Sequence, residues 1–200
     1  MFEPAVEMEE VRVGIATPAI SSKNYFANTE HYMPVDSLTE EALLAKQLDL
    51  LLVHGASAAQ SLMIEKACTV ENCAIAVMDT TSNDSKAIYN VMLNLKAKLD
   101  SNEMPDNLDV VDVRHLASSS SQLIAFDNHQ ELFNYLQSVA EASLQGCIFL
   151  AHGDISLERY TKLNKKISSF LPSSAIFISS LLFAGLAECT AIVAIQSNTD

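Results

Sequence analysis

The residues best placed to do chemistry lie in a turn that follows a buried run of apolar residues. Residues 48–54 read LDLLLVH, and Gly55 follows them directly. A helix is expected to begin near Ser57, so the backbone N–H groups of its first turn have no partner within the helix. Such N–H groups attract anions, phosphate among them. The pattern therefore indicates a turn that could bind an anion weakly.

The glycine content argues against a tight phosphate cradle. Phosphate-binding loops of the common kinds use several glycines in one turn, because glycine lets the backbone approach the ligand closely. The whole chain has only five glycines, which are Gly14, Gly55, Gly146, Gly153 and Gly185. Only one of them lies in the turn after residue 54, so none of the common phosphate-loop motifs is present.

Other candidate groups occur singly. His54 and His152 each end a buried apolar run, and α/β proteins place ligand-binding groups at the ends of parallel strands. A histidine that merely ends a strand at the solvent is the alternative. Asp154 is expected to be a helix N-cap. Ser57 and Ser61 lack the GxSxG surroundings of a nucleophile elbow.

The cysteines do not form a metal-binding pattern. No CxxC pair is present, and no second Cys or His pair has the spacing of a zinc site. We therefore expect no metal and read these residues as reduced thiols of the protein core, namely Cys68, Cys73, Cys147 and Cys189.

The overall charge restricts the partners. The 200 residues carry a formal net charge of −13, and such a surface repels phosphate backbones and anionic lipid. The acidic N-terminus, MFEPAVEMEE, lacks the apolar stretch of a secretory signal. Residues 175–187 are too short to span a bilayer. The expectation is a cytoplasmic protein with no nucleic-acid partner and no membrane insertion.

The first half of the chain alternates strands and helices. Strands are expected at residues 11–16, 48–54, 73–78 and 108–115. Helices are expected at residues 37–47, 57–69 and 84–99, the first opened by a capping box of Ser37 and Glu40, and residues 102–107 are expected to form a loop. Buried strands separated by helices predict a parallel sheet with right-handed crossovers.

The second half is expected to be a compact β-α-β-α-β-β unit. Strands are predicted at residues 122–126, 146–151, 175–182 and 190–196. Helices are predicted at residues 128–143, capped by Asn128, and 154–171, ended by Pro172. The strand at residues 175–182 could pair between subunits if it lies at an uncovered edge. The segment ASSSS at residues 117–121 has a linker-like composition and divides the two halves.

This order of elements resembles FtsZ, the bacterial cell-division protein of the tubulin-like family. The resemblance rests on the opening MFEP before VRVGIA, on residues 37–80, and on residues 146–195. It implies a parallel Rossmann-like α/β domain at residues 1–116, a Ser-rich linker at residues 117–121 and a smaller α/β sandwich domain at residues 122–200. It also implies a nucleotide-binding site, now vestigial, at Gly55, Ala56, Ser57, Ala58 and Ser61.

Several departures from the family bear on its GTPase chemistry. The glycine-rich turn after the first strand is replaced by ATPAI, in which Pro18 has no N–H for a phosphate. The second phosphate loop is shortened. In FtsZ a long central helix, followed by an aspartate-bearing loop, completes the GTPase site of the neighbouring subunit. With a strand at residues 108–115 followed directly by ASSSS, no residues remain for either, and no catalytic residue is assigned.

The resemblance and the departures together suggest a pseudo-GTPase associated with cell division. Such a protein would hydrolyse no GTP, would need no cofactor, and would act on FtsZ or other division proteins or by self-association. One alternative is an FtsZ-type protein that retains weak GTP binding at residues 55–61. Another is an unrelated small α/β division inhibitor or enzyme. An FtsZ relative is expected to show two subdomains hinged near residues 118–121, and the last alternative one continuous sheet.

Overall fold

The computed structural model describes residues 11–19, 25–82, 85–101 and 107–196. Its strands are β1 Val13–Thr17, β2 Tyr32–Pro34, β3 Leu50–Val53, β4 Ala74–Asp79, β5 Gln122–Phe126, β6 Leu144–His152, β7 Ile176–Leu182 and β8 Cys189–Ile195. They form one eight-stranded sheet in the order β2-β1-β3-β4-β5-β8-β6-β7. Neighbouring strands are parallel except at β8, which runs antiparallel to β5 and β6. The predicted α/β class with a mostly parallel sheet is confirmed.

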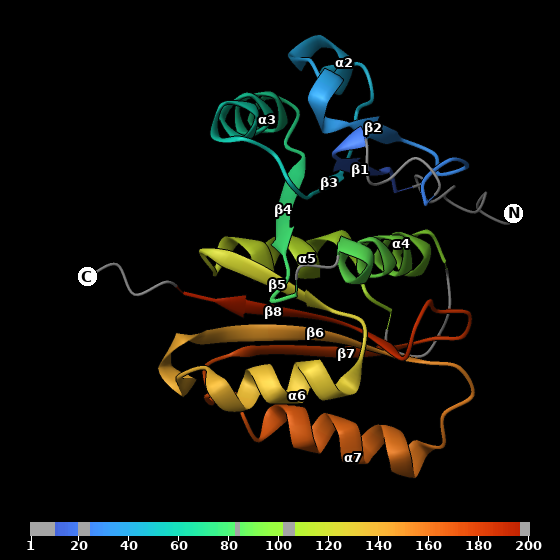
Figure 1. The fold of residues 1–200 in the computed structure, drawn as a ribbon, viewed down its shortest axis with the longest axis vertical. Coiled ribbons are helices and arrows are strands. Elements are labelled where there is room, and N and C mark those ends of the chain that lie inside the picture. Colours follow the sequence, from blue (N-terminus) through green and yellow to red (C-terminus); the bar gives the residue numbers. More distant parts are fainter. Residues whose placement is uncertain (1–10, 20–24, 83–84, 102–106, 197–200) are drawn as a thin grey trace, which may run out of the picture.

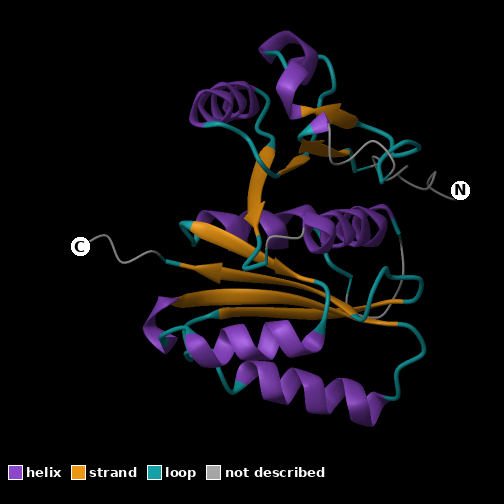
Figure 2. Cartoon of the chain, viewed as in Figure 1, coloured by secondary structure: helices purple, strands orange, loops and turns teal. Residues whose placement is uncertain are grey.

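Helices cover both faces of this sheet (Figures 1 and 2). They are α2 Glu40–Leu44, α3 Ala58–Val70, α4 Ser85–Asp100, α5 Val110–Ser118, α6 His129–Ser138 and α7 Leu157–Ser168, with 3₁₀ turns at Val35–Ser37 and Glu141–Ser143. One face packs against α4 and α5 in a single apolar cluster that extends from β1 to β6. On the other face α2 and α3 cover β1 and β3, whereas α6 and α7 cover β5, β6 and β8.

Helix α4 is the central element of the molecule. Its predicted apolar stripe is confirmed, because Ile88, Val91, Met92, Leu95 and Leu99 are all buried. The helix packs against β1 on one side and against β5 and β8 on the other. It therefore contacts both halves of the sheet, and Figure 1 shows it between them.

The strand predicted at residues 108–115 is wrong, because this segment forms helix α5. Asp109 is its N-cap, and Asp109 and Asp112 form a reciprocal capping box in which each carboxylate accepts the backbone N–H of the other residue, at 2.9 and 3.1 Å. The three valines of the segment suggested a strand, since β-branched residues favour strands. The cap and the burial of Val113 and Leu116, three residues apart, are helical features.

Two predicted helix starts are also wrong. Helix α2 begins after Thr39, whose hydroxyl accepts the N–H of Ala42 at 3.2 Å, because Ser37 belongs to the preceding 3₁₀ turn. Helix α7 begins after Ser156, so Asp154 is not its N-cap. The predicted N-cap Asn128 of α6 is confirmed, and α3 begins near Ser57 as expected, with Ser57 as its N-cap.

Residues 117–121 connect the two halves without an extended linker. Helix α5 runs to Ser118, Ser119 is its C-cap, and the N–H of Ser121 donates to Ile195 O at 2.9 Å. The sheet is continuous through β4, which pairs with β3 and with β5. A continuous sheet was the expectation for an unrelated small α/β protein, whereas two hinged subdomains were the expectation for an FtsZ relative. The division into residues 1–116, 117–121 and 122–200 stays a prediction.

Some expectations fall on parts of the chain that are not described. The loop predicted at residues 102–107 lies almost wholly outside the described residues, as does the opening MFEP. Within the described ranges, no helix is long and apolar enough to cross a membrane. The same ranges contain no group of three or more His, Cys, Asp or Glu side chains placed to hold a metal ion.

Candidate functional site

The predicted nucleotide-binding turn lies at the C-terminal end of β3 and opens helix α3. A capping box closes this helix start. The hydroxyl of Ser57 accepts the N–H of Gln60 at 3.4 Å, and the Gln60 Oε1 accepts the N–H of Ser57 at 2.8 Å. The Gln60 amide also donates from Nε2 to Val35 O at 2.9 Å, which holds the side chain across the helix start. The chain itself therefore uses N–H groups that an anion would need.

The turn after β1 packs directly against this helix start. Gly55 has a φ of +70°, and a Cβ placed there would lie 2.7 Å from Pro18 Cγ. The N–H of Ala19 donates to Asp36 Oδ2 at 3.0 Å. The Asp36 carboxylate thus accepts a backbone N–H group that lies beside the turn, and its negative charge opposes the binding of a phosphate there.

Residues of the predicted site do lie together at one edge of the sheet. Gly55, Ser57 and Ala58 are exposed, whereas Ala56 and Ser61 are half-buried. The Ser61 N–H continues the helix by donating to Ser57 O at 2.8 Å. On the other face of the same edge, the Thr17 hydroxyl is buried with no partner among the described residues. The order of strand, turn and helix agrees with the sequence, and the use of this turn for a nucleotide stays a prediction. The sequence could not show that Gln60 and Asp36 accept hydrogen bonds from the backbone donors there.

His54, at the same edge, is a structural residue in this arrangement. Its Nδ1 donates to Met78 O at 3.1 Å, and its ring contacts Tyr89 edge-on with centroids 6.2 Å apart. The ring thus connects β3 with the end of β4 and with α4. This geometry agrees with the alternative reading of a histidine that ends a strand.

A cleft of about 850 Å³ lies between α4 and the turn that follows β5. Its polar lining comes from the start of α4, from the turn between β5 and α6, and from Tyr25; these residues include Lys86, Asn90, Asp127, Asn128 and Glu131. Leu186 and Ala187 of the connection between β7 and β8 complete it. None of the predicted site residues lines this cleft.

Two asparagines on α4 hydrogen-bond to residues that line the cleft or lie next to it. Asn90 donates to Asp127 Oδ2 at 2.7 Å. The Asn94 amide donates to Leu186 O at 3.0 Å and to Thr190 Oγ1 at 2.9 Å, and its oxygen accepts the N–H of Leu186 at 2.8 Å. Because both asparagines are nearly fully buried, these hydrogen bonds specify how α4 lies on the second half of the sheet.

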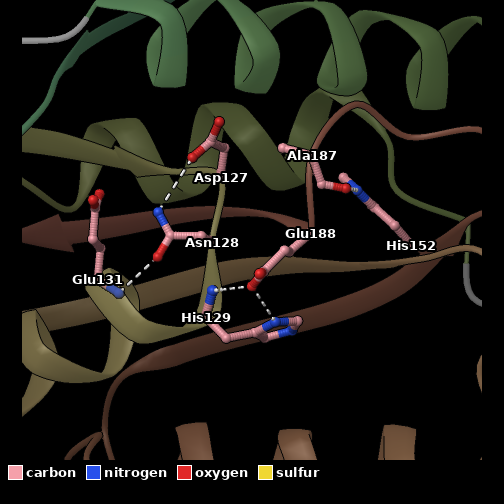
Figure 3. Close-up of polar contacts among 7 residues, drawn as sticks. All are labelled: Asp127, Asn128, His129, Glu131, His152, Ala187 and Glu188. Atoms are coloured by element: carbon pink, nitrogen blue, oxygen red, sulfur yellow. Dashed lines mark hydrogen bonds and ion pairs between the residues drawn. The ribbon is translucent and has the colours of Figure 1, made fainter.

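His152 extends this network, as Figure 3 shows for its contact with Ala187. Its Nδ1 donates to Ala187 O at 3.2 Å, which leaves Nε2 to accept the hydroxyl of Thr190 at 3.0 Å. Burial lowers the pKa of His152, although the hydrogen bond to Ala187 acts in the opposite direction. The neutral ring therefore suits the network, and the sequence reading of His152 as a ligand-binding group has no support in its contacts.

His129 and Glu188 hydrogen-bond to one another beside the cleft residues Asn128 and Ala187 (Figure 3). The backbone N–H and the Nδ1 of His129 both approach Glu188 Oε2, at 3.3 and 3.2 Å. These hydrogen bonds, the backbone one foremost, lower the pKa of Glu188. Asp127 O accepts the N–H groups of Glu188 and Cys189 at 3.0 and 3.2 Å. These hydrogen bonds join the start of α6 to the start of β8. The Glu188 carboxylate is engaged by His129, so the contacts described here do not form a paired-carboxylate site for acid–base chemistry.

Of these residues, only His152, as a candidate ligand-binding group, and Asn128, as a helix cap, were singled out from the sequence. Asn90 and Asn94 are four residues apart on α4, so a polar pair within a buried helical face was the available signal. Asp127 and Asn128 follow a predicted strand, which was a second signal. Their partners at residues 186–190 could not be identified, because 92 residues separate Asn94 from Leu186.

Comparisons with known proteins find similarity in structure only. No protein-family profile matches the sequence, and no curated protein matches it. Among solved structures, FtsZ from M. jannaschii described as an empty dimer aligns at a TM-score of 0.60 and 10% identity, over 94% of this chain and 89% of that chain. A mutant form of FtsZ from M. jannaschii aligns at a TM-score of 0.53 and 13% identity, over 78% and 68%.

These similarities test the resemblance that the sequence suggested. Identities of 10% and 13% are too low to carry a function across. The alignment with the empty dimer nevertheless covers most of both chains, so it includes both halves of the sheet. The chain therefore has an FtsZ/tubulin-like fold.

Proposed function

We propose that this chain is an FtsZ-like pseudo-GTPase that acts through contacts with other proteins. The observation that carries the proposal is the closed start of α3. Gln60 accepts the N–H of Ser57, and Asp36 accepts the N–H of Ala19. A triphosphate would have to displace a neutral amide and a carboxylate, and it would find only one glycine in the turn. Both features disfavour GTP binding.

The partner in this proposal is FtsZ, another division protein or a second copy of this chain. One of the structurally similar proteins is described as a dimer, which fits self-association of this fold. In this role the chain would be a cytoplasmic regulator or filament cap rather than an enzyme. Retained weak GTP binding at residues 55–61 is the alternative within the same fold.

Calorimetry with GTP on nucleotide-free protein tests whether the chain binds GTP, which the pseudo-GTPase proposal denies. We expect no heat of binding at millimolar GTP. The matched variant is Gln60→Ala, which frees the N–H of Ser57 without adding charge. Clear binding by the unaltered chain would contradict the pseudo-GTPase reading. Binding by the variant alone would identify the closed cap as the reason.

Co-sedimentation with FtsZ filaments tests whether the chain acts through contacts with other proteins. We expect the chain to appear in the pellet with filaments, or to change how much FtsZ assembles. The same assay without FtsZ reports self-association. A chain that stays in the supernatant, stays monomeric and leaves assembly unchanged would argue against the proposed role.

A specific observation favours a second candidate function. The strand predicted at residues 108–115 left no residues for a central helix or for its aspartate. Helix α4 instead lies between the two halves, and Asp109 and Asp112 follow it at the start of α5. The resemblance implies that an aspartate-bearing loop after a central helix completes a neighbouring subunit's GTPase site. We propose that this chain could supply Asp109 or Asp112 to a neighbour that holds GTP.

A hydrolysis assay separates the two candidates. The second candidate predicts that added chain increases GTP hydrolysis by FtsZ, and that Asp109→Asn and Asp112→Asn reduce this increase. Asparagine keeps the side-chain acceptor that caps α5, so the helix should remain intact. An unchanged or lower rate with the unaltered chain would reject the second candidate and leave the first in place.

A further inference from the structure

Cys68 and Cys73 are brought together by the way helix α3 ends. The N–H of Cys73 donates to Cys68 O at 2.9 Å, and the N–H of Asn72 donates to Thr69 O at 3.4 Å. Asn72 has a φ of +55°. This is a Schellman ending, in which the side chains at the positions of Cys68 and Cys73 come into contact. Here both of those side chains are thiols, and both are free.

The Cys73 Sγ donates to Ala74 O at 3.3 Å. Interaction between the two neighbouring thiols lowers the pKa of Cys68 and, together with burial, raises that of Cys73. Cys68 is 2% exposed, whereas Cys73 is half-buried. Both line a cleft of about 360 Å³ together with Arg114. The Arg114 guanidinium donates to Asn72 O at 2.8 Å, which holds the turn between the two cysteines in place. Cys73 is therefore the thiol that a small reagent can reach, and Cys68 lies next to it.

We propose that Cys68 and Cys73 form a reversible dithiol–disulfide site that reacts with low-molecular-weight disulfides of the glutathione class. In the first step the Cys73 thiol loses its proton and its sulfur attacks one sulfur of the disulfide; because Cys68 and burial raise the pKa of Cys73, this step is slow near neutral pH and becomes faster as the pH rises. A mixed disulfide forms at Cys73, and one thiol is released. In the second step the Cys68 thiolate attacks the Cys73 sulfur and releases the second thiol. The protein loses two hydrogens and two electrons, and the small disulfide gains them as two thiols.

The other two cysteines provide an internal comparison. Cys147 lies in β6 and Cys189 in β8, and both are fully buried. In the β6–β8 ladder Cys147 pairs with Val193, and Cys189 pairs with Ala151, so the two residues are not opposite one another. Burial raises the pKa of both thiols. We therefore expect neither to react in the folded protein.

The experiment uses the full chain, folded and unfolded in urea, equilibrated with mixtures of oxidised and reduced glutathione. After acid quenching and alkylation of free thiols, the chain is cleaved on the carboxyl side of glutamate. Because Glu71 lies between the two cysteines, cleavage there yields two peptides that stay joined only when the disulfide is present. Mass spectrometry then measures the ratio of joined to separate peptides. Cys73→Ser is the matched variant, since it removes the reachable thiol.

In the folded chain we expect this ratio to exceed that of the unfolded chain by ~10-fold or more, because the held contact raises the effective thiol concentration. Cys147 and Cys189 should stay alkylatable after unfolding, and Cys73→Ser should take up no glutathione. Three results would overturn the proposal. They are a ratio no higher than that of the unfolded chain, a reaction that stops at glutathionylated Cys73, and a folded chain that stays fully reduced.

Discussion

Removal of the Asn94 side chain tests whether α4 is fixed to the second half of the sheet by its amide. Asn94→Ala deletes hydrogen bonds to Leu186 N, Leu186 O and Thr190 Oγ1. Each such bond contributes about 1 kcal/mol net, and a buried group left without a partner costs about 1–3 kcal/mol. Leu186 is 42% exposed and can be rehydrated, whereas Thr190 is fully buried and keeps its contact with His152. We therefore expect a loss of about 2–4 kcal/mol in the free energy of unfolding.

Urea unfolding followed by circular dichroism measures this loss. With a denaturant dependence of about 2 kcal/mol per M for a chain of this size, the midpoint should fall by roughly 1–2 M. Asn134→Ala is the matched control, because Asn134 is exposed on α6 and accepts a hydrogen bond from the exposed side chain of Gln130. Surface changes of this kind usually alter stability by about 0.5 kcal/mol or less. If both variants shift the midpoint equally, the reasoning about the buried amide is refuted.

Two further predictions concern pH and close packing. Because burial lowers the pKa of His152 in the folded state, the unfolded chain binds more protons below about pH 6.5. Stability should therefore fall as the pH decreases from about 7.5 to about 5, and His152→Gln should weaken this slope in urea titrations; an unchanged slope would assign it to other groups. At Gly146 an added Cβ would lie 2.5 Å from the backbone oxygen of Ile176 on the neighbouring strand, so Gly146→Ala should cost about 1–3 kcal/mol in thermal or urea unfolding. An unaltered midpoint would mean that β6 and β7 separate there without strain.

Much of the fold followed from local patterns. Residues 50–53 and 73–78 are apolar runs, and they form β3 and β4. Strand β3 is buried on both faces, as in a covered parallel sheet, whereas Val77 of β4 is 49% exposed. Every strand and helix of the second half was predicted in order, although the start of α7 was placed too early. The α4 stripe was predicted correctly because five apolar residues repeat at helical spacing.

The errors arose where two local signals competed. At residues 108–115 the valines favoured a strand, and the Asp109–Asp112 capping box decided for a helix. Because a strand was expected there, α4 was not recognised as a helix between the two halves, and Asp109 and Asp112 were not considered as functional residues. The order of the strands, with β8 between β5 and β6, depends on contacts between distant residues, so no local pattern could predict it.

In the candidate sites, too, features set by local sequence could be predicted, whereas features that depend on contacts between distant residues could not. The placement of Gly55, Ser57 and Ser61 at one sheet edge followed from the strand before them, and its use for a nucleotide stays a prediction. The roles of Gln60 and Asp36 required knowledge of which atoms meet in space. The contact between Cys68 and Cys73 was missed because their spacing matches no metal motif, whereas a Schellman ending makes this spacing a contact.

The narrow join between the two halves of the sheet has a mechanical consequence. Strand β4 pairs with β3 along Ala74 to Val77, but with β5 only through Met78 and Asp79. Two rungs resist shear weakly, so most of the resistance to pulling the halves apart must come from α4 and the apolar cluster beneath it. Under tension the molecule would yield first at β4–β5, and the first half would separate from α4 before the network of Asn90 and Asn94 opened.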